Sequence, residues 1–356
     1  MFQEATFSSN LQRLVNSEVD AVRNFSALEA AITAAGGAAV VSRKQLKSIA
    51  DGETSRLSTE QLDALDAYFR ATRSQSLVAL MAEYNRLLSV VARSPEARFM
   101  LGERPSGIRD GLSLSKWDFD SMAGFLQAMY ALDRGGNLRL RFSEVRMETD
   151  DEVSSESYES DFGDEEWYRH LTSNECPIVC LGSPRSCHAA EWLMAKMFGI
   201  QPFARAGAEG LPFYFGWSRD HYFRHGCSFV RMREPADGLV YPWENRSIII
   251  PGDREYVIEP AGKAWKSYGI TVVQRLPEPA VVRAVFCGLS GPETRGAVGI
   301  SGQMEVPPFS GDGSSPVAWA LSESRFELKN PGEPTSARRF LSSEVVRSGV
   351  WHRPGG

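Results

Sequence analysis

The chain has 356 residues, of which 42% are hydrophobic and 24% charged, a composition typical of a globular protein with a sizeable core. Its length favours two domains, because compact cores usually comprise about 100–200 residues. No apolar run approaches the about 20 residues that span a bilayer, and the start, MFQEATFSSNLQR, lacks the basic leader and apolar block of a secretory signal. We therefore expect a soluble, cytoplasmic protein with no membrane partner and with free thiols at its five cysteines.

The net charge of −6 is concentrated in one segment. Ten acidic residues and no Lys or Arg lie between Glu148 and Glu166, so the remaining residues carry a net charge of +4. Serines are also frequent there, and such a polar stretch buries too little apolar surface to order itself. The composition predicts a mobile acidic surface loop over residues 148–166.

Residues 1–101 predict an all-helical module. Apolar residues recur at steps of three and four, as in Leu28, Ala31 and Ile32, and this is the period of an amphipathic helix. Ser58 precedes a second such pattern and predicts a helix start, because its hydroxyl can accept a bond from a first-turn amide. A further helix is predicted from Leu77 to Ala97.

Within this module, residues 42–52 (SRKQLKSIADG) predict a short helix with Leu46 and Ile49 facing inward. A glycine-ended turn and the helix starting at Ser58 follow it. This arrangement resembles repressors of the lambda/Cro type, with residues 25–36 as the positioning helix before a recognition helix. The resemblance implies a helix-turn-helix-like bundle that binds DNA phosphates and base edges, usually as a homodimer. The DNA-contacting side chains that it implies are Arg43, Lys44, Gln45 and Lys47.

The charge of the module leaves a second interpretation open. Residues 1–100 carry eleven basic and eleven acidic side chains, so the module lacks the net positive charge that drives phosphate affinity. A helical adaptor that binds a partner protein is the alternative to a DNA reader.

Residues 102–137 predict a connector, rich in glycine as far as Ser115, and then a linking helix over residues 118–132. Strand-like sequence begins with the alternation from Leu138 to Phe142 and defines a predicted α/β domain over residues 138–345, followed by a frayed tail over residues 346–356. Its further predicted strands are Ile178–Leu181, Phe213–Phe215, Ser247–Ile250, Tyr256–Ile258, Ile270–Val273 and Val281–Cys287.

The first of these strands runs into a glycine turn and then a helix (CPIVCLGSPRSCHAAEW). The turn contains Gly182, Ser183, Arg185 and Ser186. Amides at a helix start carry partial positive charge, hydroxyls add donors, and Arg binds phosphate in a forked geometry, so the turn is a candidate anion site. The pattern resembles the strand–turn–helix of Rossmann-like nucleotide-binding domains, although it is neither a Walker loop nor GxGxxG. The alternative is a glycine that merely permits a tight turn.

A second strand, ending at Cys287, enters a similar turn. Its candidate ligand-binding residues are Gly288, Ser290, Gly291 and Thr294. If the two strands are neighbours, both turns point to one crevice, and we predict a shared nucleotide or anion pocket. Glu191 lies on the helix that follows the first glycine turn. It could contact a ribose or act as a catalytic carboxylate, and otherwise it only complements the helix dipole.

The predicted fold is therefore a multidomain α plus α/β protein, with a helix-turn-helix-like bundle before a Rossmann-like domain. The leading hypothesis is a DNA-binding regulator that senses a nucleotide or similar phosphorylated molecule. The first alternative is a nucleotide-processing enzyme, a glycohydrolase-like effector as in phage defence, with Glu191 as catalytic residue and a helical adaptor. The second is a non-catalytic scaffold. The chain contains neither a CxxC pair nor HExxH, so we predict no metal site, and a nucleotide is the sole suspected cofactor.

Overall fold

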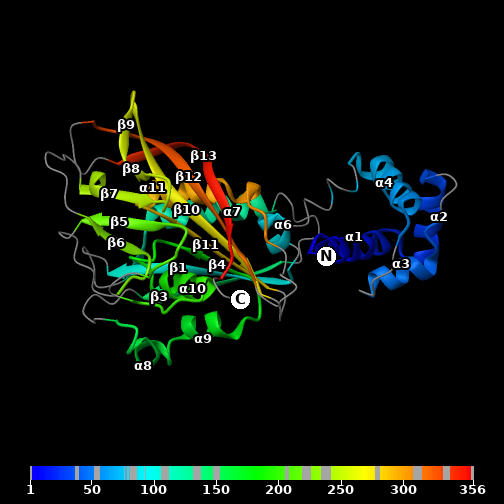
Figure 1. The fold of residues 1–356 in the computed structure, drawn as a ribbon, viewed down its shortest axis with the longest axis horizontal. Coiled ribbons are helices and arrows are strands. Elements are labelled where there is room, and N and C mark those ends of the chain that lie inside the picture. The colour runs from blue at the N-terminus through cyan, green and yellow to red at the C-terminus, as the bar shows by residue number, and fades with distance from the viewer. Residues whose placement is uncertain are drawn as a thin grey trace.

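The protein is a mixed α/β protein in which a group of N-terminal helices is followed in the chain by two β-sheets and their flanking helices (Figure 1). In the part of the chain that the structure describes, no helix has the length and apolarity needed to cross a membrane. This computed structural model describes residues 2–36, 40–51, 57–75, 77, 80, 86–92, 94–105, 112–130, 138–146, 153–204, 208–218, 226–233, 242–276, 281–307, 315–331 and 337–353.

The N-terminal helices share one hydrophobic cluster, which contains the predicted inward residues Leu46 and Ile49. The predicted helix over residues 25–36 and the predicted start at Ser58 are confirmed, since the Ser58 hydroxyl accepts a bond from the Gln61 amide at 3.3 Å. Tyr68 donates to the buried Glu18 at 2.8 Å and so ties two helices together. These helices are α1 (Phe2–Val22), α2 (Phe25–Gly36), α3 (Arg43–Ala50) and α4 (Thr59–Arg73).

The larger sheet has nine strands in the order β13-β12-β10-β11-β4-β1-β2, with β3 paired to β1 and β9 to β10. Strands β3, β1, β4 and β11 are mutually parallel, whereas β10, β12 and β13 continue the sheet in antiparallel fashion. The strands are β1 (Glu96–Pro105), β2 (Leu112–Leu114), β3 (Arg139–Arg146), β4 (Ile178–Leu181), β9 (Glu259–Ala261), β10 (Ala264–Arg275), β11 (Val282–Gly288), β12 (Val317–Leu328) and β13 (Arg338–Trp351).

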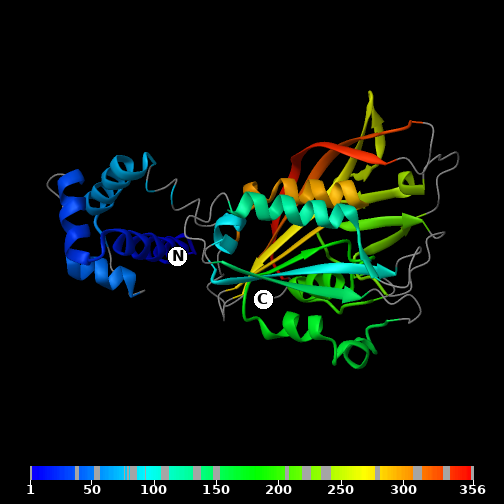
Figure 2. The same ribbon diagram turned by 180° about the vertical axis from the view of Figure 1, so that it is seen from behind.

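Both faces of the central strands are covered, which explains their continuous apolar sequence. Ile178 and Cys180 of β4 belong to one hydrophobic cluster, and Val179 and Leu181 belong to the other. Helices α7 (Lys116–Tyr130) and α11 (Gly291–Gly299) lie side by side over the second cluster (Figure 2). Over the first cluster lie α8 (Tyr158–Phe162), α9 (Glu166–Ser173) and α10 (His188–Phe198).

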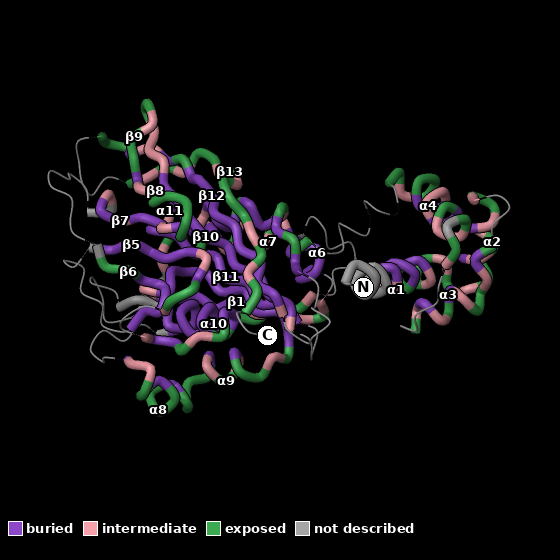
Figure 3. Tube along the Cα trace, viewed as in Figure 1, coloured by how far each residue is buried: buried purple, intermediate pink, exposed green. Residues whose placement is uncertain are grey.

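A second sheet, in the order β6-β5-β7-β8, adds its aromatic residues to the first cluster. Phe213, Phe215 and Phe229 are fully buried there, and the interior strands in Figure 3 are correspondingly purple. This sheet consists of β5 (Tyr214–Ser218), β6 (Val230–Arg233), β7 (Arg246–Ile249) and β8 (Glu255–Val257), and the remaining short elements are α6 (Leu87–Ala92) and the 3-10 turns Pro242–Asn245 and Ser301–Gln303.

Three sequence predictions are wrong. Residues 96–105 form strand β1 where a helix end and a connector were predicted, because β3 and β4 pair with both of its edges. Part of the predicted acidic loop is ordered, since Val153, Tyr158 and Phe162 pack into the first cluster, whereas residues 147–152 lie outside the described residues. The predicted tail begins inside β13, which continues to residue 351.

Candidate functional site

The two glycine turns lie next to each other at the carboxyl edge of the larger sheet. Strands β4 and β11 are parallel neighbours, with Leu181 opposite Phe286. The amide of Gly182 donates to the carbonyl of Phe286 at 3.0 Å, so the ladder continues to the point where both chains turn away. The predicted neighbourhood of the two turns is therefore present in the fold.

At the same edge, the connections that leave two neighbouring parallel strands lie on opposite faces of the sheet. Strand β1 leads, through the short antiparallel strand β2, to α7 on one face, whereas its neighbour β4 is followed by α10 on the other. Ligands of open α/β sheets bind outside the carboxyl ends of strands at such a point. A Cβ atom on Gly102, just after the last residue of β1 that pairs with β4, would lie 3.4 Å from the carbonyl oxygen of Ser186, so the first turn lies directly against β1.

Internal hydrogen bonds shape the first turn. Gly182 has φ of +133°, and a Cβ there would lie 3.1 Å from the Cβ of Cys187, so this position requires glycine. The Ser186 amide donates to the Ser183 carbonyl at 2.8 Å, and the Ser183 hydroxyl accepts from the Arg185 amide at 3.3 Å. Helix α10 begins directly after this turn, with its first amides at the same edge.

Two arginines and one tryptophan connect the turns. The guanidinium of Arg185 lies 4.3 Å from the ring centre of Trp217 on β5, and that of Arg246 on β7 lies 4.6 Å from the same ring. Arg246 also donates to the carbonyl of Leu289, in the second turn, at 2.7 Å. Two guanidinium groups are thus held against one buried indole at the carboxyl edge. We name Arg185, Trp217 and Arg246 the arginine–tryptophan stack.

Close packing determines the glycines of the second turn. A Cβ on Gly288 would lie 2.5 Å from the Glu293 Cβ, and one on Gly291 would lie 2.3 Å from the ring of Trp117. The Thr294 hydroxyl donates back to the Ser290 carbonyl at 3.3 Å, inside the first turn of α11. Gly288 and Gly291 thus allow α7 and α11 to approach the strand end closely.

A buried carboxylate lies beside this turn. Glu293 is fully buried and accepts a bond from the Ser290 hydroxyl through Oε2, while Arg338 of β13 donates to the same hydroxyl. The second carboxylate oxygen, Oε1, has no hydrogen-bond partner among the described residues. Burial lowers the pKa of Arg338, which the nearby Glu293 carboxylate partly offsets.

Glu191, the candidate catalytic residue, is fully buried and holds two loops of the domain. Its Oε1 accepts from the amides of Phe203 and Ser228, each at 2.9 Å, and its Oε2 accepts from the Cys227 thiol at 3.3 Å. Burial raises the pKa of Glu191, and these hydrogen bonds partly oppose that rise. The donors already occupy both oxygens, so this geometry favours a structural role.

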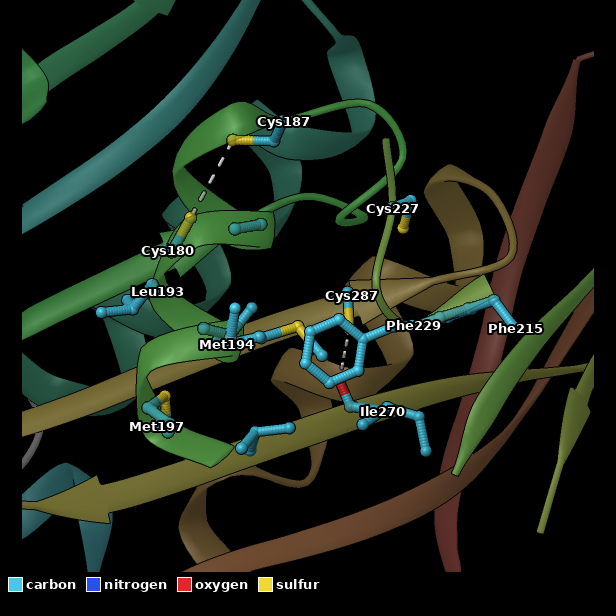
Figure 4. Close-up of a cluster of buried hydrophobic side chains, with 14 of the residues drawn as sticks. Cys180, Cys187, Leu193, Met194, Met197, Phe215, Cys227, Phe229, Ile270 and Cys287 are labelled. Atoms are coloured by element: carbon cyan, nitrogen blue, oxygen red, sulfur yellow. Dashed lines mark hydrogen bonds between the residues drawn. The ribbon is translucent and has the colours of Figure 1, made fainter. Parts of the chain in front are cut away.

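All five cysteines are free and buried. Figure 4 shows Cys180, Cys187 and Cys287 in a cluster of buried apolar side chains, and the sulfurs of Cys180 and Cys187 are 4.0 Å apart. The contact with Cys180 and the amides at the start of α10 lower the pKa of Cys187, whereas that contact and burial raise the pKa of Cys180. Within the described residues, no group of three or more His, Cys, Asp or Glu could hold a metal.

On the N-terminal helices, three of the four predicted DNA-contacting side chains are exposed along α3: Arg43, Lys44 and Lys47. Gln45 is engaged differently. Its Oε1 accepts from the Ser42 amide at 3.1 Å, and its amide group donates to Gln61 at 3.2 Å, so it caps α3 and joins α3 to α4.

Sequence reasoning missed Arg246, Glu293 and Arg338. Arg246 and Arg338 lie far from the turns in the sequence, and Glu293 lies beside the second turn but belongs to no recognisable motif. The pairing of distant strands brings these residues to the carboxyl edge. The chain matches no protein-family model, no curated protein and no solved structure.

Proposed function

We propose that this protein is a ligand-responsive DNA-binding regulator, and that its α/β domain is Rossmann-like and binds a nucleotide or a similar phosphorylated small molecule. The observation that carries the proposal is the arginine–tryptophan stack, which links the two neighbouring glycine turns at the carboxyl edge. A phosphate there would meet the guanidinium of Arg185 and the first amides of α10. The half-buried Arg185 is the residue through which a ligand would gain most.

The proposed output is the helical module. Helix α3 exposes the basic residues Arg43, Lys44 and Lys47 and buries its apolar residues Leu46 and Ile49. This distribution of side chains is typical of a recognition helix that enters a major groove. Gln45 contributes indirectly by capping that helix and fixing its angle to α4.

The ligand half is tested by melting the full chain with a panel of nucleotides, including NAD and cyclic species, while mass spectrometry follows each nucleotide. A ligand that binds only the folded state raises the melting temperature by mass action. Arg185→Gln should weaken that ligand at least about 10-fold, because a hydrogen bond to a charged group contributes about 1.5–3 kcal/mol.

Arg231→Gln is the matched control, because Arg231 also lies over an aromatic ring, 3.9 Å from that of Tyr214, but on β6. It should leave the ligand shift unchanged. No shift with any nucleotide, or an equal loss in both variants, would contradict a phosphate site at the first turn.

The DNA half is tested by retention of a random duplex library on the full chain across a salt series. Arg43→Ala and Lys47→Ala should each weaken binding and reduce the slope of log K against log salt by about 0.9, the value for one lost phosphate contact. Arg70→Gln, which removes an exposed arginine of α4, is the control. Unchanged retention in the α3 variants would leave the helical adaptor as the better interpretation.

The same mass spectrometry separates the regulator from the nucleotide-processing enzyme. A ligand recovered intact supports sensing, whereas products would indicate turnover. In that case Glu293→Gln is the first variant to make, because Glu293 lies beside the second turn with one oxygen free of hydrogen bonds among the described residues. Glu191→Gln would come second, since both of its oxygens are occupied.

A further inference from the structure

Strand β13 forms one edge of the nine-stranded sheet and carries exposed apolar side chains. It is 14 residues long, and β12 is its sole partner among the described strands. Leu341, Val346 and Val350 are 43%, 36% and 53% exposed, and Figure 3 shows β13 in green and pink beside the purple strands. A long edge with apolar side chains is a template for pairing with another strand.

The sequence of this edge is complementary to itself when read backwards. Around the point between Val345 and Val346, Glu344 on one side corresponds to Arg347 on the other, and Ser343 corresponds to Ser348. Antiparallel pairing of two copies about that point would therefore place each glutamate opposite an arginine of the other copy. It would also place Leu341, where the ladder with β12 has a second register shift, opposite Val350.

A two-fold axis perpendicular to the sheet requires that paired residues project from the same face. In a regular strand, residues three apart project from opposite faces. Here the ladder shifts at Val346, so that Arg347 is opposite Leu321 and Glu344 is opposite Glu323. Leu321 and Glu323 are two residues apart on β12 and share a face, so Glu344 and Arg347 share a face as well.

The same register shift places the flanking residues together. Ser343 is opposite Ser324 and Ser348 is opposite Ala320, both at even positions of β12 and hence on its other face. Thus the bulge, which would disrupt pairing with a strand of unrelated sequence, makes this edge match a second copy of itself.

Electrostatics favour the same partner. Glu344 is exposed and makes no ion pair with any described residue, and it lies directly opposite Glu323, a like-charged neighbour. Glu323 is already neutralised by Lys266 and Arg325, at 3.6 and 3.2 Å. An arginine from a second copy would supply the missing cation to Glu344.

We propose that two copies of this chain associate through antiparallel pairing of their β13 edges, with the two-fold axis between Val345 and Val346 and with Glu344 of each copy opposite Arg347 of the other. The pairing joins two nine-stranded sheets into one continuous sheet. It depends neither on the ligand nor on DNA, and so it stands or falls separately from the proposed function.

Two charge reversals test this arrangement in the full chain by light scattering after size exclusion. Glu344→Arg places two arginine pairs at the interface, and Arg347→Glu places two glutamate pairs there. Each variant alone should dissociate at least about 100-fold more readily than the unmodified dimer, because apposed like charges cost several kcal/mol.

An equimolar mixture of the two variants should then form a heterodimer, since both contacts become arginine–glutamate pairs again. Native mass spectrometry distinguishes that heterodimer from either homodimer by its mass. Recovery on mixing would exclude a general folding defect, because mixing two misfolded variants would not restore the fold of either.

Arg339→Glu, at the far end of β13 and paired within the chain to Glu327, is the control and should remain dimeric. Because Arg347 also pairs with Asp253 at 3.3 Å, Arg347→Glu with Asp253→Asn replaces the single variant if that one unfolds. The proposal is overturned if the unmodified chain is monomeric, if the single variants dimerise as it does, or if their mixture stays monomeric.

Discussion

Replacing Glu191 separates its structural role from a catalytic one. The buried carboxylate accepts two backbone amides, from Phe203 and Ser228, and the Cys227 thiol. Glu191→Leu removes every acceptor while roughly keeping the volume of the side chain. Glu191→Gln keeps an amide oxygen in place for both backbone donors and loses only the acceptor of the thiol.

The magnitudes follow from the number of donors left without a partner. Each buried amide that loses its acceptor costs about 1–3 kcal/mol, so Glu191→Leu should lower the free energy of unfolding by about 2–6 kcal/mol. Glu191→Gln should cost less than about 1.5 kcal/mol, the upper range of one ordinary hydrogen bond.

The pH dependence gives an independent check. Burial raises the pKa of Glu191 in the folded state, so the folded protein favours its protonated form. The stability that this group contributes is therefore fully present at low pH and declines as the pH rises towards the folded-state pKa. The stability of Glu191→Gln relative to the unmodified chain should accordingly improve as the pH is raised through that range.

Guanidinium unfolding of both variants, followed by tryptophan fluorescence, measures these differences. Equal stabilities for Glu191→Leu and Glu191→Gln would refute the assignment, because the two backbone amides would then not need their acceptor. If Glu191→Gln abolished the rise in melting temperature caused by the ligand without changing the stability of the protein, Glu191 would instead be assigned to the binding site.

The remaining predictions concern packing and protonation. Gly288→Ala should lower the free energy of unfolding by about 1–3 kcal/mol, because the new Cβ would lie 2.5 Å from the Glu293 Cβ. In Gly302→Ala the nearest atom to the new Cβ would be 3.5 Å away, on Leu88, so the free energy of unfolding should change by less than about 0.5 kcal/mol. Thermal melts compare the two, and equal losses would contradict the close packing of the second turn. Burial lowers the pKa of His188 to about 4 from an ordinary value of 6.5, so the folded state holds it neutral. The protein should lose about 3 kcal/mol as the pH falls from 6.5 towards 4, and His188→Phe should reduce that loss when unfolding is measured along a pH series. An identical pH profile in the variant would exclude His188 as the source.

The two glycine turns carry different weight for function. In the first, Gly182 adopts a backbone conformation that other residues rarely adopt, and Arg185 beside it is half-buried. In the second, Gly288 and Gly291 are required by the close approach of α11 and Trp117. Similar sequence patterns thus have different causes, and the first turn is the better place to look for a ligand.

Local sequence determined the elements whose pattern matches their burial. The four apolar residues of β4 predict a strand covered on both faces, and the alternation of Leu46 and Ile49 with basic residues predicts the orientation of α3. The caps at Ser42 and Ser58 are also local, because each serine bonds to an amide only three residues away.

Tertiary structure alone decided the rest. Strand β1 contains charged residues at both ends and acquires its strand conformation from the neighbours on each edge, while β13 alternates too weakly to be recognised before β12 is known to lie beside it. The arginine–tryptophan stack joins residues 185, 217 and 246, and the amides of Phe203 and Ser228 share one acceptor, Glu191 on α10. Such contacts depend on which distant strands pair, and no short-range pattern in the chain encodes that choice.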